Sequence, residues 1–204
     1  MRLNRANQVT LLRIILIIPF VICLIKSRQV PSGHLLRYGA AVIFVLMALS
    51  DALDGYLARV KKQVTRLGAF LDPLADKLLM TCACILLSLP ATAVEGFALP
   101  VEVVALIIGK DVLVLLGFVV LYFMTGDAQI MPVGVGKAST FLQLLMVGSI
   151  LIGPEASGLT SLWIYFVEGL WWLTGAAAAA AAGVYIRNGL RYIERFENNA
   201  SKGS

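Results

Sequence analysis

Residues 50–79 read SDALDGYLARVKKQVTRLGAFLDPLADKLL, a stretch in which four aspartates stand beside apolar runs that could cross a bilayer. They are Asp51, Asp54, Asp72 and Asp76. A carboxylate at membrane depth is costly, and it is rare unless it lines a wet cavity, pairs with a cation or binds a metal ion. With glycines beside them, the four acids predict a divalent-metal site at a membrane surface.

The composition of the whole chain agrees with a membrane location. Of the 204 residues, 59% are hydrophobic and only 14% are charged, and the mean hydropathy is +0.87. A soluble domain has roughly a quarter of its residues charged. We therefore expect a single membrane domain over residues 1–204. The net charge of +5 comes from basic residues at span ends, which indicates contact with anionic lipid and no nucleic-acid partner.

Six apolar stretches come close to the length of roughly 20 residues that a transmembrane helix needs. The sequence predicts an all-α integral membrane protein with six transmembrane helices, over residues 10–26, 35–59, 67–90, 100–124, 134–153 and 161–187. Proline, glycine and polar residues gather in the breaks between them. The polar start of the chain lacks a cleavage signal, so the first span is expected to stay as an anchor. The polar tail from about residue 188 is expected to continue the last helix before fraying.

The distribution of Lys and Arg predicts the orientation of these spans. If both termini are cytoplasmic, most basic residues lie inside, and only Lys26, Arg28 and Arg37 lie outside. The loops near residues 91–99 and 153–160 carry no Lys or Arg, as outer loops should. The four acids then lie at the cytoplasmic ends of the second and third spans. We therefore expect a multi-pass protein of the cell (inner) membrane whose active site faces the cytoplasm.

The spacing of the acids explains how they could share metal ions. Asp51 and Asp54 are three residues apart and Asp72 and Asp76 are four apart, so each pair shares one face of a helix. Two antiparallel helices joined by a short turn can bring the pairs together, where like charges would raise the carboxyl pKa values unless cations neutralise them. Oxygen-only ligands favour hard metals such as Mg²⁺, Mn²⁺ or Ca²⁺. Two such ions would suit a diphosphate.

The residues around the acids suit a phosphate ligand. Gly55 and Gly68 leave room for a ligand to reach the backbone. Arg59, one turn past Gly55, can pair with a phosphate as a two-pronged donor. The alternative interpretation is a set of ordinary Asp–Arg and Asp–Lys pairs at helix ends. It is less favoured because unpaired carboxylates near hydrocarbon are so costly.

The pattern D-x2-D-G-x2-A-R-x8-G-x3-D-x3-D resembles the signature of the CDP-alcohol phosphotransferase family. Every position and gap is matched, by Asp51, Asp54, Gly55, Ala58, Arg59, Gly68, Asp72 and Asp76. The entry to the first helix is similar to the family's N-x2-T-x2-R…P, through Asn7, Thr10, Arg13 and Pro19. The fifth span opens like the G-K-x-K-T-x2-Q of the phosphatidylglycerophosphate and cardiolipin synthase branches, through Gly136, Lys137, Thr140 and Gln143. The resemblance covers roughly residues 5–145.

The resemblance implies a six-helix enzyme, usually a homodimer, with a polar cavity that opens to the cytoplasm and to lipid. Its members cleave a CDP-linked donor between the phosphates and release CMP. Carried over by position, two Mg²⁺ or Mn²⁺ ions would be held by Asp51, Asp54, Asp72 and Asp76. Asp76 would also be the catalytic base on the acceptor hydroxyl. CDP would be contacted by Asn7, Thr10, Gly55, Ala58, Arg59, Thr65 and Gly68.

The acceptor is less well determined by the sequence. Lys110 and Asp111 stand inside the fourth span, either lining a cavity or satisfying neighbouring groups, and Lys110, Lys137 and Arg13 offer a basic acceptor pocket. In phosphatidylglycerophosphate synthases the place of Gly109–Asp111 tends to read A-R-E, with a later Arg that is absent here. The second Lys of G-K-x-K-T is Ser139. Each departure removes an anion contact. Gly109-Lys110-Asp111 followed by aliphatic residues instead resembles the eukaryotic-type cardiolipin synthases.

We expect the phosphatidyl group of CDP-diacylglycerol to pass to glycerol-3-phosphate, since that activity is the more widespread. The alternatives are phosphatidylglycerol or another alcohol as acceptor. Two rival classes are an ion transporter with acidic sites and a membrane prenyltransferase, neither of which explains the full spacing. The three cysteines lie in apolar runs and predict neither disulfides nor a zinc site. The small-residue run Gly175–Gly183 predicts a packing or dimer face.

Overall fold

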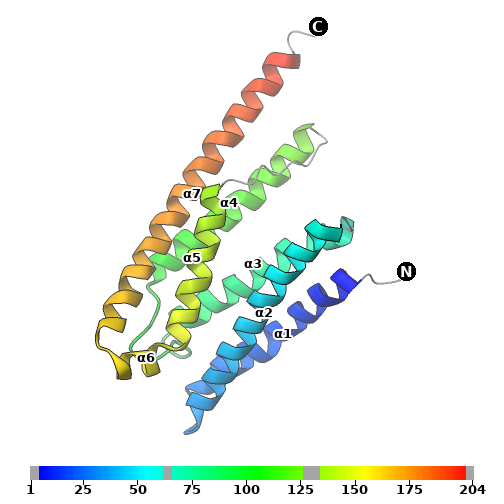
Figure 1. Cartoon of the computed structure of the whole chain (residues 1–204). Coiled ribbons are helices and arrows are strands. Elements are labelled where there is room, and N and C mark those ends of the chain that lie inside the picture. The colour runs from blue at the N-terminus through cyan, green and yellow to red at the C-terminus, as the bar shows by residue number, and fades with distance from the viewer. Residues whose placement is uncertain (1–4, 62–65, 126–133, 201–204) are drawn as a thin grey trace. The chain divides into compact units, whose positions relative to one another are not determined.

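The computed structural model of the chain describes the backbone of residues 5–61, 66–125 and 134–200, and the side chains of residues 12–50, 77–117, 134–158 and 160–192. Every regular element in these ranges is a helix (Figure 1). The helices are α1 (Arg5–Ser27), α2 (Gly33–Lys61), α3 (Arg66–Ser88), α4 (Val101–Thr125), α5 (Gly134–Leu151), α6 (Gly153–Leu159) and α7 (Leu162–Ala200). The all-α fold class is therefore confirmed, and each predicted span coincides with a helix to within two residues or lies inside one.

Three helical segments are long and apolar enough to cross a membrane. They are Gly33–Ser50, Gly134–Leu151 and Leu162–Tyr192. The parts of α1, α3 and α4 with described side chains are too short to be tested in the same way, although Lys77–Ser88 on α3 is a shorter apolar helix. The structure thus supports a helical protein with at least these candidate spans.

The helices belong to two compact units, which are described separately. Unit 1 comprises Met1–Pro100 with Leu144–Glu168, and unit 2 comprises Val101–Gln143 with Gly169–Ser204. Helices α5 and α7 each contribute one part to each unit.

The core of unit 1 forms where α1 packs against both α2 and α3. Phe20 on α1 and Phe44 on α2 are buried, with ring centroids 6.1 Å apart. Leu24 and Met47 extend the same interface and are 0% and 1% exposed. Cys84 on α3 is buried, which is the core role that the sequence predicts for it.

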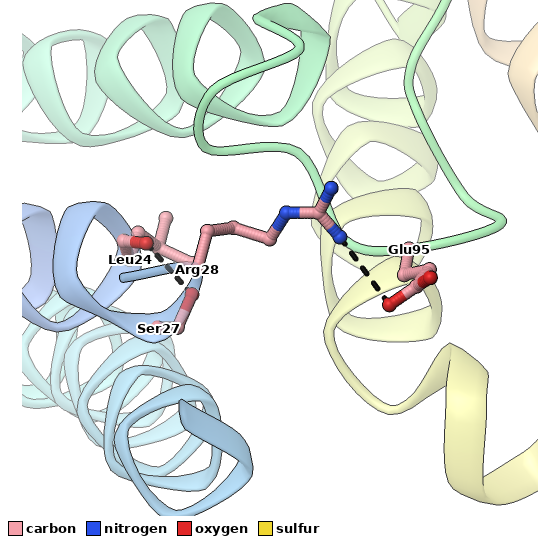
Figure 2. A network of polar contacts seen from close by, with 4 residues as sticks. All are labelled: Leu24, Ser27, Arg28 and Glu95. Carbon is pink, nitrogen blue, oxygen red and sulfur yellow. Dashed lines mark hydrogen bonds and ion pairs between the residues drawn. The ribbon is translucent and has the colours of Figure 1, made fainter. Parts of the chain in front are cut away.

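Three connections that the sequence places outside the membrane meet at one end of unit 1. Arg28, just after α1, pairs with Glu95 in the α3–α4 connection, with 3.4 Å between Nη1 and Oε2 (Figure 2). Arg37 near the start of α2 forms an ion pair with Glu155 on α6. Each of these connections joins an odd-numbered span to the even-numbered span that follows it. If successive spans alternate in direction, all three connections lie on the same side, which agrees with the contacts between them.

The turn between α1 and α2 depends on the glycine that begins α2. A β-carbon added to Gly33 would lie 1.8 Å from the carbonyl oxygen of Ser27 and 2.8 Å from its carbonyl carbon. Both atoms are backbone, so no side-chain rotation can relieve the overlap. Gly33 therefore fixes how closely the two helices approach at this end of unit 1.

We expect Gly33→Ala to destabilise the protein by about 2–3 kcal/mol, since overpacking against backbone forces the chain to move. The thermal unfolding midpoint in detergent should fall by roughly 5–10 °C. Gly169→Ala on α7 is the matched control, because nothing lies within 4 Å of an added β-carbon there. If both variants melt like the wild-type protein, this account of the turn is wrong.

Close helix packing also defines unit 2. A β-carbon on Gly136 of α5 would lie 2.5 Å from the Tyr185 hydroxyl of α7, and one on Gly175 would lie 3.4 Å from Leu106 of α4. Ala178 and Ala181 of α7 are both 0% exposed. The small-residue run of α7 is therefore a packing face within unit 2, which is one of the two roles predicted for it.

The last connection differs in one detail from the sequence-based expectation, and the helix after it agrees with that expectation. The break after the fifth span contains the short helix α6, which begins with proline in its first turn, where the missing amide hydrogen is harmless. The last predicted span, 161–187, is part of a helix that runs on to Ala200. The polar tail therefore continues the helix, as expected.

Candidate functional site

The acidic motif lies on the two helices that pack against α1. The backbones of Asp51 and Asp54 belong to α2, and those of Asp72 and Asp76 belong to α3. Their side chains lie outside the described residues, as do those of Gly55, Ala58, Arg59 and Gly68. Asn7 and Thr10 lie on the first turns of α1, again with undescribed side chains, and Thr65 falls in the undescribed segment 62–65.

Helix geometry places the motif far from the outer connections. Asp51 follows Gly33 by 18 residues, or roughly 27 Å of helix, and Asp76 precedes Ser88 by 12 residues, or roughly 18 Å, at 1.5 Å per residue. Figure 1 shows the start of α1, the end of α2 and the start of α3 at the same end of unit 1. The three segments predicted to bind metal and CDP are thus brought to one end of this unit.

The described side chains contain no group of three or more His, Cys, Asp or Glu that could share a metal ion. The predicted metal ligands all belong to the motif. Their side chains lie outside the described residues, so this finding does not bear on them. By their chemistry, four carboxylates spaced in pairs on neighbouring helices suit hard divalent ions. A metal site at this end of unit 1 therefore stays a prediction, based on that donor set.

Lys110, a predicted acceptor ligand, is buried in unit 2. Only 3% of its side chain is exposed. The Lys110 ammonium donates to the Ser139 hydroxyl oxygen across 3.3 Å and lies 3.2 Å from Oδ1 of Asp111. The sequence predicts that Lys110 and Asp111 either line a cavity or satisfy neighbouring polar groups. The contacts described here are of the second kind.

The other two predicted acceptor ligands have different surroundings. Lys137 stands two residues before Ser139 on α5 and is exposed, whereas Ser139 is 0% exposed. Lys137 therefore points away from the buried contact between Lys110 and Ser139. Arg13 lies on α1 in unit 1 and is buried, with 3% exposed. Of the three predicted acceptor ligands, Lys110 thus has a described contact with the fifth-helix motif, through Ser139.

Gln143 is a polar residue for which the sequence alone predicted no binding role. It is 1% exposed, and its side-chain nitrogen Nε2 has no hydrogen-bond partner among the described residues. Gln143 follows Ser139 by one helical turn, so the two side chains share the buried face of α5. The signal available in the sequence was its place as the glutamine of the G-K-x-K-T-x2-Q pattern.

Comparison with known proteins gives a family match over most of the chain. A family model described as CDP-alcohol phosphatidyltransferase matches residues 3–184. This range includes the whole acidic motif and all of α1–α5.

Curated relatives with two different acceptors resemble the chain. A CDP-diacylglycerol–glycerol-3-phosphate 3-phosphatidyltransferase of Bacillus subtilis is 33% identical over 159 residues, covering 73% of this chain and 77% of that protein. One with the same name from Rickettsia typhi is also 33% identical, covering 76% of this chain and 80% of that protein. A probable CMP-forming cardiolipin synthase of Drosophila melanogaster is 32% identical over 166 residues, covering 72% of this chain but 48% of that protein.

Proposed function

Because the chain belongs to the CDP-alcohol phosphatidyltransferase family, we propose that it transfers the phosphatidyl group of CDP-diacylglycerol to glycerol-3-phosphate. The products are phosphatidylglycerophosphate and CMP. The observation that carries this proposal is the acidic motif, which lies in the second half of α2 and the first half of α3 with every family position filled. The glycerol-3-phosphate enzymes among the relatives support the choice of acceptor.

We propose that the motif works at the cytoplasmic face of a six-span homodimer in the cell (inner) membrane. Three of the six spans are supported by their length and hydropathy. The contacts between the outer connections agree with alternating spans. The remaining spans, the dimer and the orientation are inferred from the distribution of charge and from the family.

The motif residues divide the chemistry between them. Asp51, Asp54, Asp72 and Asp76 would hold two Mg²⁺ or Mn²⁺ ions, which supply positive charge to the diphosphate when bound. Gly55, Ala58, Arg59 and Gly68 would contact the cytidine diphosphate, with support from Asn7, Thr10 and Thr65. The guanidinium of Arg59 can donate two parallel hydrogen bonds to phosphate oxygens.

Asp76 would act as the base for the acceptor. Its carboxylate takes the proton of the acceptor hydroxyl, and the acceptor oxygen forms a bond to the phosphorus that carries diacylglycerol. The bond from that phosphorus to the bridging oxygen of CMP breaks, and CMP leaves with the electron pair. A positioned base of this kind contributes about 10²–10⁴-fold to the rate.

One observation favours phosphatidylglycerol as a second candidate acceptor. Lys110 is paired with Asp111 at 3.2 Å, so the pair together brings no net charge to the interior of unit 2. The phosphate diester of phosphatidylglycerol carries one negative charge, whereas the phosphate of glycerol-3-phosphate carries nearly two. A lysine whose charge is balanced by an aspartate favours the more highly charged phosphate less strongly than an unbalanced lysine would. The cardiolipin synthase among the relatives agrees with this alternative.

An acceptor screen tests the proposal. Purified protein is incubated with labelled CDP-diacylglycerol and Mg²⁺, and CMP release is measured with glycerol-3-phosphate, phosphatidylglycerol, inositol phosphate or serine. We expect release that depends on glycerol-3-phosphate, with phosphatidylglycerophosphate as the lipid product. Release with phosphatidylglycerol alone would establish the second candidate. A protein that releases no CMP with any acceptor would contradict both and favour a transport role.

A further inference from the structure

We infer that an apolar groove on α2 binds a phospholipid of the surrounding bilayer, with an acyl chain in the groove and a zwitterionic headgroup at its polar end. The inference goes beyond the proposed function, because this lipid is bound and not consumed. It concerns unit 1 alone.

The groove has a volume of about 350 Å³. The described side chains that line it are Tyr38, Ala41, Val42, Val45, Leu46 and Ile152. All but Ile152 lie on α2, and Ile152 lies between α5 and α6. Because every one of them belongs to unit 1, the groove does not depend on where unit 2 is placed. Val42 and Leu46 are 58% and 54% exposed, so the groove is open to the surroundings of α2.

The position of the groove on α2 indicates what covers it. Its α2 residues lie within Gly33–Ser50, which is long and apolar enough to cross a membrane. From Tyr38 to Leu46 the lining follows roughly 12 Å of helix at 1.5 Å per residue. That length is less than half of the roughly 30 Å of hydrocarbon in a bilayer. The groove therefore fits within one leaflet, where the available apolar molecules are acyl chains.

The size of the groove suits one acyl chain better than a helix of a second copy. At roughly 30 Å³ for a water-sized group, its volume holds about a dozen such groups in a row, as in a chain of methylenes. A helix with its side chains is about 10–12 Å wide. A helix of a second copy would also contact α2 across both leaflets, beyond the ends of the groove.

An ion pair marks one end of the groove. Tyr38 lines the groove, and the guanidinium carbon of Arg37 lies 5.7 Å from the centroid of the Tyr38 ring. Arg37 pairs with Glu155 on α6, three residues after the lining residue Ile152. Tyrosine, with an apolar ring and a polar tip, is typical of the membrane–water interface. The polar end is thus the end nearer to the start of α2.

The charges at this end favour a zwitterionic headgroup. Arg37 and Glu155 together carry no net charge, and their side chains remain 12% and 34% exposed. A guanidinium can donate to more than one acceptor, and a carboxylate can accept from more than one donor. Phosphatidylethanolamine presents a phosphate to Arg37 and an ammonium to Glu155. An anionic headgroup such as that of phosphatidylglycerol has no cation for Glu155.

The test measures the phospholipid that the full-length protein retains. Protein is reconstituted in bilayers of equal parts phosphatidylethanolamine and phosphatidylglycerol and extracted in mild detergent. Native mass spectrometry then counts the lipids of each kind per chain. We expect the wild-type protein to retain phosphatidylethanolamine in preference to phosphatidylglycerol. Equal retention of both lipids would overturn the assignment of the headgroup.

Val42→Phe fills the groove and leaves its polar end unchanged. We expect retained phospholipid to fall about tenfold, the change that results when about two methylene groups lose their burial. Ile18→Phe is the matched control, because Ile18 on α1 is similarly exposed, at 61%, and does not line the groove. Retention should be the same in Ile18→Phe as in the wild-type protein.

Glu155→Gln tests the headgroup. Removing the carboxylate leaves the charge of Arg37 unbalanced. The ratio of retained lipids should therefore shift toward phosphatidylglycerol by about fivefold, as for one basic residue near an anionic lipid surface. A ratio that stays at the wild-type value would show that the ion pair does not contact the headgroup, and would overturn its assignment.

The remaining outcomes decide between a lipid and a second copy. Retention that is equal in Val42→Phe and the wild-type protein overturns the inference. If Val42→Phe instead changes the oligomeric state in light scattering and leaves retained lipid unchanged, a second copy covers the groove. If the thermal midpoint shows that Val42→Phe fails to fold, Val45→Phe in the same groove decides by the same criteria. Lipid retention is measured without turnover, so failure of the proposed transfer activity would leave this test intact.

Discussion

Asp76→Asn is expected to lower the rate of phosphatidyl transfer by about 10²–10⁴-fold, the usual contribution of a positioned general base. Asparagine keeps the shape of the side chain and one oxygen that can face a metal ion. Its amide nitrogen cannot take a proton from the acceptor hydroxyl at neutral pH. Turnover should be measured with purified protein as CMP release at saturating acceptor, alongside the affinity for CDP-diacylglycerol.

The affinity measurement separates the base from a metal ligand. If Asp76 acts chiefly as the base, binding of CDP-diacylglycerol should survive largely unchanged in Asp76→Asn. Recovery of the variant at high Mg²⁺ would instead show that the lost function is metal binding. Glu95→Gln is a matched control, because Glu95 is an exposed acid of the same unit in the connection between α3 and α4. Near-normal turnover in Asp76→Asn would reject the assignment of Asp76 as the base.

The helices could be predicted from the sequence because their signals are local. Runs of apolar residues separated by proline, glycine and polar breaks correspond to α1–α5 and α7 to within a few residues at most ends. The short helix α6 was missed because its seven residues lie in a break rich in small and polar residues. The proline at its start is a local signal that could have predicted it.

The surroundings of the acceptor residues could not be predicted in the same way. The contact between Lys110 and Ser139 joins residues 29 positions apart on two helices, and no local pattern specifies which faces meet. In the sequence, Ser139 is noticeable only because it stands where the family pattern has a lysine. In the structure its small hydroxyl accepts from Lys110, whereas a lysine at position 139 would place a second ammonium against the first. The exposure of Lys137 and the burial of Gln143 likewise depend on how α5 is rotated.

The motif is a different case, because its specificity comes from spacing along helices. Intervals of three and four residues place each acidic pair on one face, and the short α2–α3 connection keeps the two helix ends close in the chain. The location of these segments at one end of unit 1 agrees with that expectation (Figure 1). How the carboxylates approach one another depends on the rotation of α2 and α3 about their axes, which the periodicity alone does not determine.

Removal of divalent metal is expected to stop CMP release entirely, and Mg²⁺ or Mn²⁺ should restore it. Four carboxylates that share one site would repel each other, and without cations they could not hold a diphosphate that is itself negatively charged. The measurement is CMP release in excess chelator, followed by titration with Mg²⁺, Mn²⁺ or Ca²⁺. Asp54→Asn should shift the metal titration to higher concentration, whereas Glu95→Gln should titrate like the wild-type protein. Full activity in chelator would show that the four acids have a role other than metal binding. The diphosphate would then have no source of positive charge beyond Arg59 and the basic residues near it in the sequence.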